Sequence, residues 1–173
     1  MPPITLQVEG IRKLLNELDL EARLDDLENR CRRTNLVFFG IPDDTVRESW
    51  EESETLVRRI CKGDLDIDVT SIQRAHRLGT FKERSCRPII ASFRNWKERD
   101  NIMRNAFKFK NSAYSVSEDF SALVREKRRK LWDYFKDKRQ DKNNKVYLTY
   151  DKLVINGDAY AWDFEQSMPV LVR

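Results

Sequence analysis

The only histidine of the chain, His76, lies between Arg74 and Arg77 in the segment SIQRAHRLG, residues 71–79. An imidazole can ligate a metal, transfer protons in catalysis, or contact a phosphate beside cationic side chains. The sequence has no Gly-x-Ser-x-Gly motif, no Walker-type loop and no Gly-x-Gly-x-x-Gly motif to accompany a catalytic histidine. It therefore predicts neither an enzyme nor a bound cofactor, and a polyanion-binding surface is the favoured interpretation.

Two other groups of residues could hold a metal, and neither has the required spacing. The three cysteines form no Cys-x-x-Cys pair, and they are Cys31, Cys61 and Cys86. Asp64, Asp66 and Asp68 alternate in GDLDID, but no glutamate follows at the spacing of a calcium loop, so a solvated linker is favoured. We expect no metal site, no disulfide framework and a reducing compartment.

Basic residues concentrate in the middle of the chain. Residues 71–110 carry 11 basic and 3 acidic side chains, net +8, and residues 111–145 carry 10 and 6, net +4. Residues 1–30 are net −3, with 4 basic and 7 acidic side chains. This distribution predicts a localised surface for a polyanion, with an ordinary solvated basic surface as the alternative.

No apolar run of 18 residues and no signal peptide occur in the sequence, so we expect neither a membrane span nor secretion. At 173 residues, the chain is long enough for one generous domain or two small ones. Its 9 Phe, 4 Trp and 5 Tyr provide large side chains for at least one hydrophobic core.

Residues 1–33 have the apolar spacing of a coiled coil in two frames. Ile4, Val8, Ile11, Leu15, Leu18 and Ala22 form the first frame, and the second follows near residue 20. This predicts two short helices or one coil with a discontinuity. In RLDDLE, Arg23 and Glu28 flank the apolar seam, as in parallel three-stranded coils; an amphipathic helix packed on its own domain is the alternative. The residues predicted to form the oligomer are Leu20, Arg23, Leu24, Leu27, Glu28 and Cys31.

The middle of the chain alternates predicted strands and helices. Strands are expected within 34–44, 69–78, 86–93 and 113–117, and helices from about 49 to 62 and from 95 to 107. Ser49 and Glu52 have capping-box spacing, and Gly63 is expected to end that helix. Trp96 and Phe107 are expected to face inward from the second helix. The order βαββαβ is that of ferredoxin-like and RNA-recognition-motif domains.

The tail is expected to form a small α/β lobe. Ser121 is a predicted cap for a basic amphipathic helix that continues through VREKRRKLWDYFKDKR. Asn156-Gly157 predicts a type I′ hairpin between two short strands. The predicted fold class is therefore α+β, with a coiled coil over 1–33, an RNA-recognition-motif-like domain over 34–111 and a C-terminal nucleic-acid-binding lobe over 112–173.

Strand periodicity does not decide which side of residues 69–78 is exposed. Arg74 and His76 share one face and Ala75 and Arg77 the other, but apolar residues occur on both. Stacking of bases on Phe38 and Phe93 would strengthen a nucleic-acid surface, whereas burial of both would make them core residues.

Five segments in order resemble the first open-reading-frame protein of LINE (long interspersed element) retrotransposons. They are LENRCRRTNLVFFGIPD, IQRAHRLG, RPIIASFRNWKERDNI, SEDFSALVREKRRKL and YLTYDKLVINGDAYAWD. The resemblance implies a parallel homotrimer that binds single-stranded RNA and DNA with little sequence preference. It also implies a nucleic-acid chaperone in cytoplasmic ribonucleoprotein particles, with the nucleus as a second compartment.

The resemblance, together with the basic pattern, assigns nucleic-acid contacts to a set of mostly basic residues. The sequence departs from the usual RNA-recognition motif on its third strand, where Pro88 and Ile90 replace the expected aromatic residues. The sequence therefore predicts that arginines, in place of stacked aromatic residues, contribute most of the binding. The predicted contacts are Arg32, Arg33, Asn35, Arg74, His76, Arg77, Arg87, Arg125, Arg128, Arg129, Tyr150 and Lys152.

A second hypothesis explains the same basic surface without nucleic acid. The chain would be an interaction module that a coiled coil assembles and that docks an acidic protein. Salt dependence does not separate the two hypotheses, because both are electrostatic, whereas dependence on strand length does. No membrane and no small-molecule substrate is expected in either case.

Overall fold

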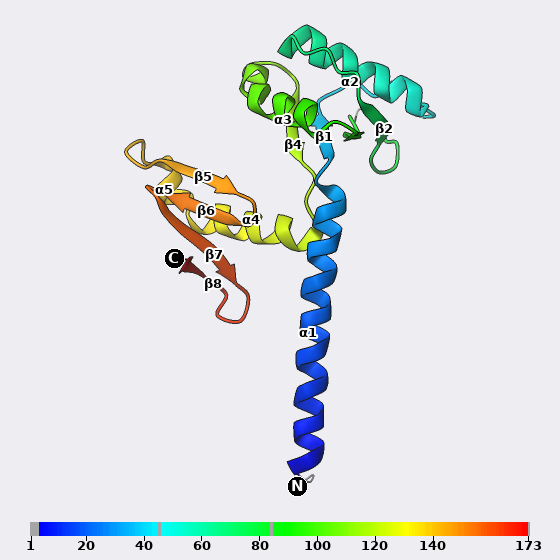
Figure 1. Ribbon diagram of the computed structural model, residues 1–173. Coiled ribbons are helices and arrows are strands. Elements are labelled where there is room, and N and C mark those ends of the chain that lie inside the picture. Colours follow the sequence, from blue (N-terminus) through cyan, green and yellow to red (C-terminus); the bar gives the residue numbers. More distant parts are fainter. Residues whose placement is uncertain (1–3, 45, 84, 173) are drawn as a thin grey trace. The chain divides into compact units, whose positions relative to one another are not determined.

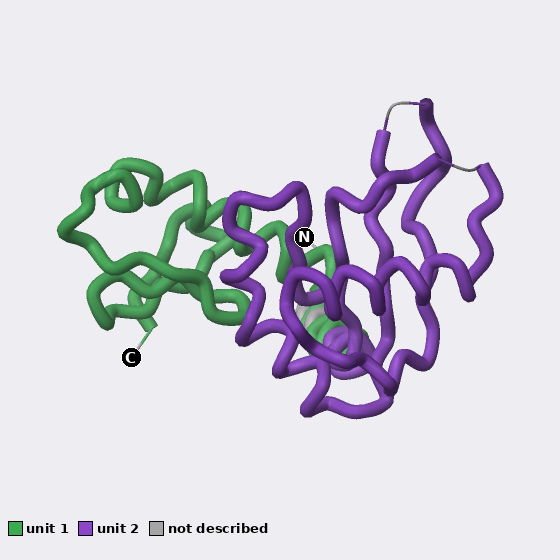
Figure 2. The backbone as a smooth tube through the Cα atoms, turned by 90° about the horizontal axis from the view of Figure 1, so that it is seen from above, with its two compact units in different colours: residues 1–28, 120–173 green, residues 29–119 purple. Residues whose placement is uncertain are grey.

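The computed structural model describes residues 4–44, 46–83 and 85–172, without the side chains of residues 4–8, 10, 11 and 18. Two antiparallel sheets and several helices make up the chain, which confirms the predicted α+β class. The chain divides into two compact units, one of residues 29–119 and one of residues 1–28 with 120–173 (Figure 2).

The N-terminal segment forms a single long helix, α1, from Ile4 to Arg32 (Figure 1). Of the two expected arrangements, the two short helices are wrong, because one helix continues through the frame change near residue 20 and includes Gly10. A continuous helix satisfies its backbone hydrogen bonds through both apolar frames, so the frame change does not require a break. Four residues of the first frame, Ile4, Val8, Ile11 and Leu18, lie outside the described side chains.

The unit of residues 29–119 contains a four-stranded antiparallel sheet in the order β2-β3-β1-β4. Its strands are β1 (Asn35–Phe39), β2 (Ile72–Arg77), β3 (Ile89–Phe93) and β4 (Ser115–Glu118). The central strand β1 pairs with β3 on one side and with β4 on the other. An observed strand overlaps each of the four expected strand segments, and β4 ends at Glu118, one residue beyond the expected segment 113–117.

Helices α2 (Trp50–Leu65) and α3 (Trp96–Asn105) follow β1 and β3, and the 3-10 turn η1 spans Ala106–Phe109. The expected capping box is confirmed, because Ser49 Oγ accepts from the Glu52 amide and the Glu52 carboxylate accepts from the Ser49 amide. The prediction that Gly63 ends α2 is wrong. The helix runs to Leu65, and Asp66 closes it in a left-handed conformation with its N–H bonded to the Cys61 carbonyl.

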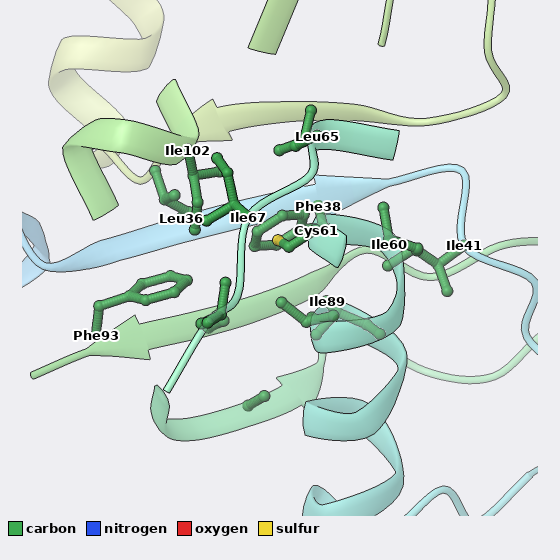
Figure 3. Close-up of a cluster of buried hydrophobic side chains, with 14 of the residues drawn as sticks. Leu36, Phe38, Ile41, Ile60, Cys61, Leu65, Ile67, Ile89, Phe93 and Ile102 are labelled. Carbon is green, nitrogen blue, oxygen red and sulfur yellow. The ribbon is translucent and has the colours of Figure 1, made fainter. Parts of the chain in front are cut away.

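One face of this sheet packs on the helices and forms the core (Figure 3). Phe38 and Phe93 are both 1% exposed, so these two rings are core residues and cannot stack on bases. The expected inward orientation of Trp96 and Phe107 is wrong, since they are 51% and 71% exposed. The helix gives way to η1 at residue 106, and this change of helical phase buries Phe109 instead.

The turn after β1 requires a glycine. Gly40 has φ of +80°, in the region that favours glycine, and a Cβ atom at this position would overlap the carbonyl oxygen of Ala113. The close approach of these two backbone segments holds the end of β1 beside the start of β4. Gly40 therefore fixes the path of the chain from the sheet into the loop before α2.

The C-terminal residues contain a second antiparallel sheet, with β5 (Val146–Thr149), β6 (Lys152–Ile155), β7 (Asp158–Asp163) and β8 (Met168–Val172) in sequential order (Figure 1). Asn156 and Gly157 have φ of 53° and 103°, as the predicted type I′ hairpin requires.

Helix α4 (Ala122–Tyr134) begins after the predicted cap Ser121, whose hydroxyl accepts from the Val124 amide. The single long helix expected here is wrong: α4 ends at Tyr134, and a separate short helix, α5, spans Lys136–Gln140. Between them Phe135 packs against the cluster that includes Leu131 and Leu153. Anchoring the Phe135 ring in this cluster accompanies the break.

Candidate nucleic-acid interface

The two faces of β2 separate its arginines. Ala75 and Arg77 are buried on the face that packs on the helices, whereas Arg74 is exposed and His76 half-buried on the other face. The sequence alternation left this orientation open, and the structure resolves it. The side that carries Arg74 and His76 therefore has accessible polar groups.

Arg77, one of the predicted nucleic-acid contacts, is bound inside its own unit. Its side chain is 3% exposed, and each of its five N–H groups donates a hydrogen bond. The acceptors are the Glu48 carboxylate and three backbone carbonyls, those of Ile41, Pro42 and Arg87. Arg77 therefore joins the loop before α2 to the sheet and has no donor left for a phosphate.

Arg87 is bound in a similar way. Its guanidinium donates to both carboxylate oxygens of Asp43, at 2.6 and 3.0 Å, and its amide donates to the same side chain. The hydrogen bond from the Arg87 side chain, with the charges of Arg77 and Arg87, lowers the pKa of Asp43 despite burial. Asp43 in turn raises the pKa of Arg87. This paired geometry indicates a structural role for Arg87.

Arg32 and Asn35 share a third acidic partner, Asp119. The Arg32 guanidinium is 2.9 Å from both Asp119 oxygens, and the Asn35 amide donates to one of them at 3.0 Å. Asp119 is 9% exposed and lies at the end of this unit, so it ties the C-terminus of α1 and the start of β1 to the end of β4. The neighbouring Arg33 is exposed.

A polar hollow lies on the sheet face that carries Arg74 and His76. Cross-strand pairing sets Arg74 and Asn35 on either side of Ser92, and His76 beside Ile90. The hollow has a volume of about 460 Å³ and is lined by Asn35, Gln73, Arg74, His76, Ile90 and Ser92. It offers amide, hydroxyl, imidazole and guanidinium groups within one surface depression.

His76 is the titratable group of this hollow. Burial, with a smaller contribution from the charge of Arg74, lowers the pKa of His76, so its imidazole is neutral at pH 7. Its Nδ1 atom is buried and has no hydrogen-bond partner within the described part of the chain. A phosphate or a base edge could supply that partner.

In the C-terminal lobe, Arg128 and Tyr150 belong to one cluster. The Arg128 guanidinium lies 4.6 Å from the centre of the Phe120 ring and donates to the Tyr150 carbonyl. The Tyr150 ring meets Phe120 edge-on, with centroids 5.9 Å apart, and is 47% exposed. The structure therefore brings together two predicted residues around a phenylalanine that the sequence analysis did not select.

The outward-facing cations of α4 are Arg125 and Arg129. Both are exposed, and within the described residues neither forms an ion pair. Lys127 instead pairs with Asp151 at 3.3 Å, and Lys152, another predicted contact, is half-buried in β6. Arg125 and Arg129 are one helical turn apart, so they place two adjacent positive charges on the exposed face of α4.

The residues predicted to form an oligomer lie on the C-terminal half of α1. Leu20, Leu24 and Leu27 are 63%, 67% and 57% exposed, and Cys31 is exposed. Arg23 pairs with Asp19 of its own helix at 3.0 Å, with both side chains exposed. The pairing of Arg23 with a glutamate of another helix, as in a trimer, stays a prediction.

Sequence reasoning missed three acidic residues that decide which cations remain available, namely Asp43, Glu48 and Asp119. Each neutralises an arginine predicted to bind nucleic acid. Their separation in sequence from those arginines, 87 residues for Asp119 and Arg32, leaves no local pattern to reveal them. Only the fold shows which basic residues are already neutralised.

The described residues hold no cluster of three or more histidine, cysteine or acidic side chains placed to bind a metal. Lys62 contacts Asp66 and Asp68, two of the alternating acids before β2, at 3.7 and 2.8 Å. None of the described helices is long and apolar enough to cross a membrane. No family model and no curated protein sequence matches this chain.

Proposed function

We propose that this chain is a single-stranded nucleic-acid-binding protein and chaperone of the kind encoded by the first open reading frame of LINE retrotransposons. It would act in cytoplasmic ribonucleoprotein particles. The observation that carries the proposal is that the predicted arginines fall into two groups, those paired with buried carboxylates and those that are exposed. Three predicted arginines are held by buried carboxylates, while Arg74, Arg125 and Arg129 are exposed and without ion pairs in the part described.

The arrangement of residues 29–119 supports this proposal. The order of elements, β1-α2-β2-β3-α3-β4, and the sheet order β2-β3-β1-β4 fit a ferredoxin-like, RNA-recognition-motif-like domain. In such domains one sheet face packs on the helices and the other is available to bind. Here the second face carries the hollow around Arg74 and His76. Ile90 lines it where an aromatic residue would stack, so polar and charged contacts replace stacking.

Exposed leucines on α1 support a trimeric assembly. Leu20, Leu24 and Leu27 recur at coiled-coil spacing with more than half of each side chain exposed. Such a stripe on a soluble helix is normally covered by partner helices. Three copies would raise the local concentration of basic surfaces, so contacts that are weak and fast in one copy would still retain a strand.

Chaperone activity needs no catalytic group. Exposed cations reduce repulsion between phosphate backbones, which lets complementary strands approach and anneal. Weak contacts release mispaired strands so that they separate and pair again. The exposed arginines can therefore account for both binding and annealing.

The test compares two polyanions of equal charge, a labelled single strand and poly-glutamate. We expect wild-type protein to bind longer strands more tightly, to accelerate annealing of complementary strands, and to prefer the strand over poly-glutamate. The Arg125→Ala/Arg129→Ala variant should lose both activities, whereas Arg12→Ala/Lys13→Ala on the exposed part of α1 is the matched control. Equal affinity for poly-glutamate, with no annealing, would support the acidic-partner module instead.

A further inference from the structure

A second surface of the unit of residues 29–119 has the opposite charge to the candidate nucleic-acid interface. It is a groove of about 540 Å³ beside α2, between that helix, the loop after β1 and Tyr114. Ile41 and Ile60 form buried parts of its apolar lining, and Leu56 and Tyr114 are half-buried there. Leu56 and Tyr114 therefore keep accessible apolar surface inside the groove.

Four carboxylates line this groove, against a single basic residue, Arg59. Two of the four are bound internally. Glu48 accepts from Arg77 and from the Ser53 hydroxyl, and Glu52 accepts from the Ser49 amide in the capping box. These two carboxylates are part of the structure of the unit.

The other two carboxylates, Asp44 and Glu51, are exposed, and neither forms a hydrogen bond or an ion pair through its side chain within the described residues. Asp44 lies in the middle of the loop between β1 and α2, and Glu51 lies in the first turn of α2. Their charges face solvent beside the apolar lining formed by Leu56 and Tyr114. The groove thus combines an apolar lining with two available negative charges.

This chemistry excludes the ligand of the candidate nucleic-acid interface. Carboxylates repel phosphates, and the excess of acidic groups here gives no counterion release with a nucleic acid. A partner with cationic groups and one large apolar side chain has the complementary chemistry. Cations would face Asp44 and Glu51, and an apolar side chain would cover Leu56 and Tyr114.

We propose that this groove binds a basic segment of a different protein, which places one aromatic or large aliphatic side chain against Leu56 and Tyr114 and pairs lysine or arginine with Asp44 and Glu51. The site is independent of the nucleic-acid interface and does not require it. A protein partner could therefore stay bound in this groove while the exposed arginines of the nucleic-acid interface hold a strand.

The test uses the full chain, free of nucleic acid, and three fluorescein-labelled peptides of equal length. The first alternates arginine and alanine around one central tryptophan, the second replaces the tryptophan with alanine, and the third replaces the arginines with glutamate. The variant is Asp44→Lys/Glu51→Lys, which changes two exposed side chains. Its matched control is Asp133→Lys/Asp137→Lys, an equal charge reversal at exposed positions of the other unit.

We expect the first peptide to bind, the second to bind roughly tenfold more weakly because it lacks the apolar anchor, and the third not to bind. The Asp44→Lys/Glu51→Lys variant should lose roughly tenfold or more of the affinity for the first peptide, with the control variant unchanged.

Equal peptide affinity in the wild type and in the Asp44→Lys/Glu51→Lys variant would overturn the proposal, and so would absence of peptide binding. If sedimentation instead shows self-association that this variant abolishes, a second copy occupies the groove and the proposal is also overturned. Strand binding by the Asp44→Lys/Glu51→Lys variant separates the groove proposal from the nucleic-acid proposal. If the variant still binds the strand while peptide binding fails, the nucleic-acid proposal stands.

Discussion

Replacing Arg77 with alanine distinguishes a structural arginine from a ligand-binding arginine on the same strand. Arg77 and its partner Glu48 have side chains only 3% and 6% exposed, and Asp43, 3.9 Å from Arg77, has no exposed side-chain surface. Removing the guanidinium leaves the Glu48 carboxylate and three backbone carbonyls without those donors. Breaking a buried pair by removing one partner costs about 3–5 kcal/mol.

Arg74, two residues earlier, is the matched comparison. Its side chain is exposed and makes no hydrogen bond to another described residue. Arg74→Ala should therefore change the free energy of unfolding by no more than about 0.5 kcal/mol. The same change should weaken strand binding, because Arg74 lines the polar hollow.

The rate at which the Cys61 thiol is labelled measures how often the unit of residues 29–119 opens. It is buried, and burial, with the charge of Asp64, raises the pKa of its thiol to about 12. Labelling therefore requires the unit to open. In a Cys31→Ser/Cys86→Ser background, which removes the two exposed cysteines, Arg77→Ala should accelerate labelling of Cys61 at least roughly a hundredfold, as 3 kcal/mol or more implies.

Arg74→Ala should leave the labelling rate of Cys61 close to that of the parent. A labelling rate unchanged by Arg77→Ala, with strand affinity reduced, would refute the structural role of Arg77. It would mean that the guanidinium leaves its internal acceptors to bind nucleic acid.

Three further predictions follow from single features of the structure. Gly40→Ala should destabilise the unit of residues 29–119 by about 1–3 kcal/mol, because a Cβ there overlaps Ala113. Urea denaturation would measure this loss, and an unchanged free energy of unfolding would contradict the turn geometry. Strand affinity should rise as the pH falls from neutral, since the lowered pKa of His76 keeps the free imidazole neutral and a bound phosphate favours its protonated form. His76→Gln should remove this rise in a titration of affinity against pH. Leu24→Glu/Leu27→Glu should give a monomer in sedimentation equilibrium with an unchanged fold for the rest of the chain, and a persisting trimer would place the oligomer contacts elsewhere.

Local sequence signals predicted much of the fold. The Ser49 and Glu52 capping box, the Ser121 cap and the Asn156-Gly157 hairpin depend on residues within a few positions of each other. Such interactions are fixed by backbone geometry and recur wherever the spacing recurs. The predicted strands differ from the observed ones only at their ends, where pairing with distant strands decides the last residue.

Helix ends and buried faces depend on tertiary contacts and were predicted less well. The expected long tail helix stops at Tyr134, because the Phe135 ring packs with Leu131 and the sheet instead of continuing the helix. Phe107 points outward because η1 changes the rotation per residue after α3. Neither effect has a signature in a short stretch of sequence.

Prediction of the candidate interface shows the same division between local sequence signals and tertiary contacts. Charge counting located the basic region, but it could not separate exposed arginines from those held by Asp43, Glu48 and Asp119. These partners come from distant segments, so only folding brings the opposite charges together. Of the twelve predicted contacts, the structure leaves the exposed arginines and the residues of the hollow as the strongest candidates.

The most direct test of nucleic-acid binding is the salt dependence of affinity for a labelled single strand, measured for wild type and for an Arg74→Ala/Arg125→Ala/Arg129→Ala variant. Each phosphate contact contributes about 0.7 to the slope of log affinity against log salt for single strands. We predict that the triple variant lowers the magnitude of this slope by about 2 while the fold is kept. An unchanged slope, or no binding by the wild type at low salt, would contradict the proposed function.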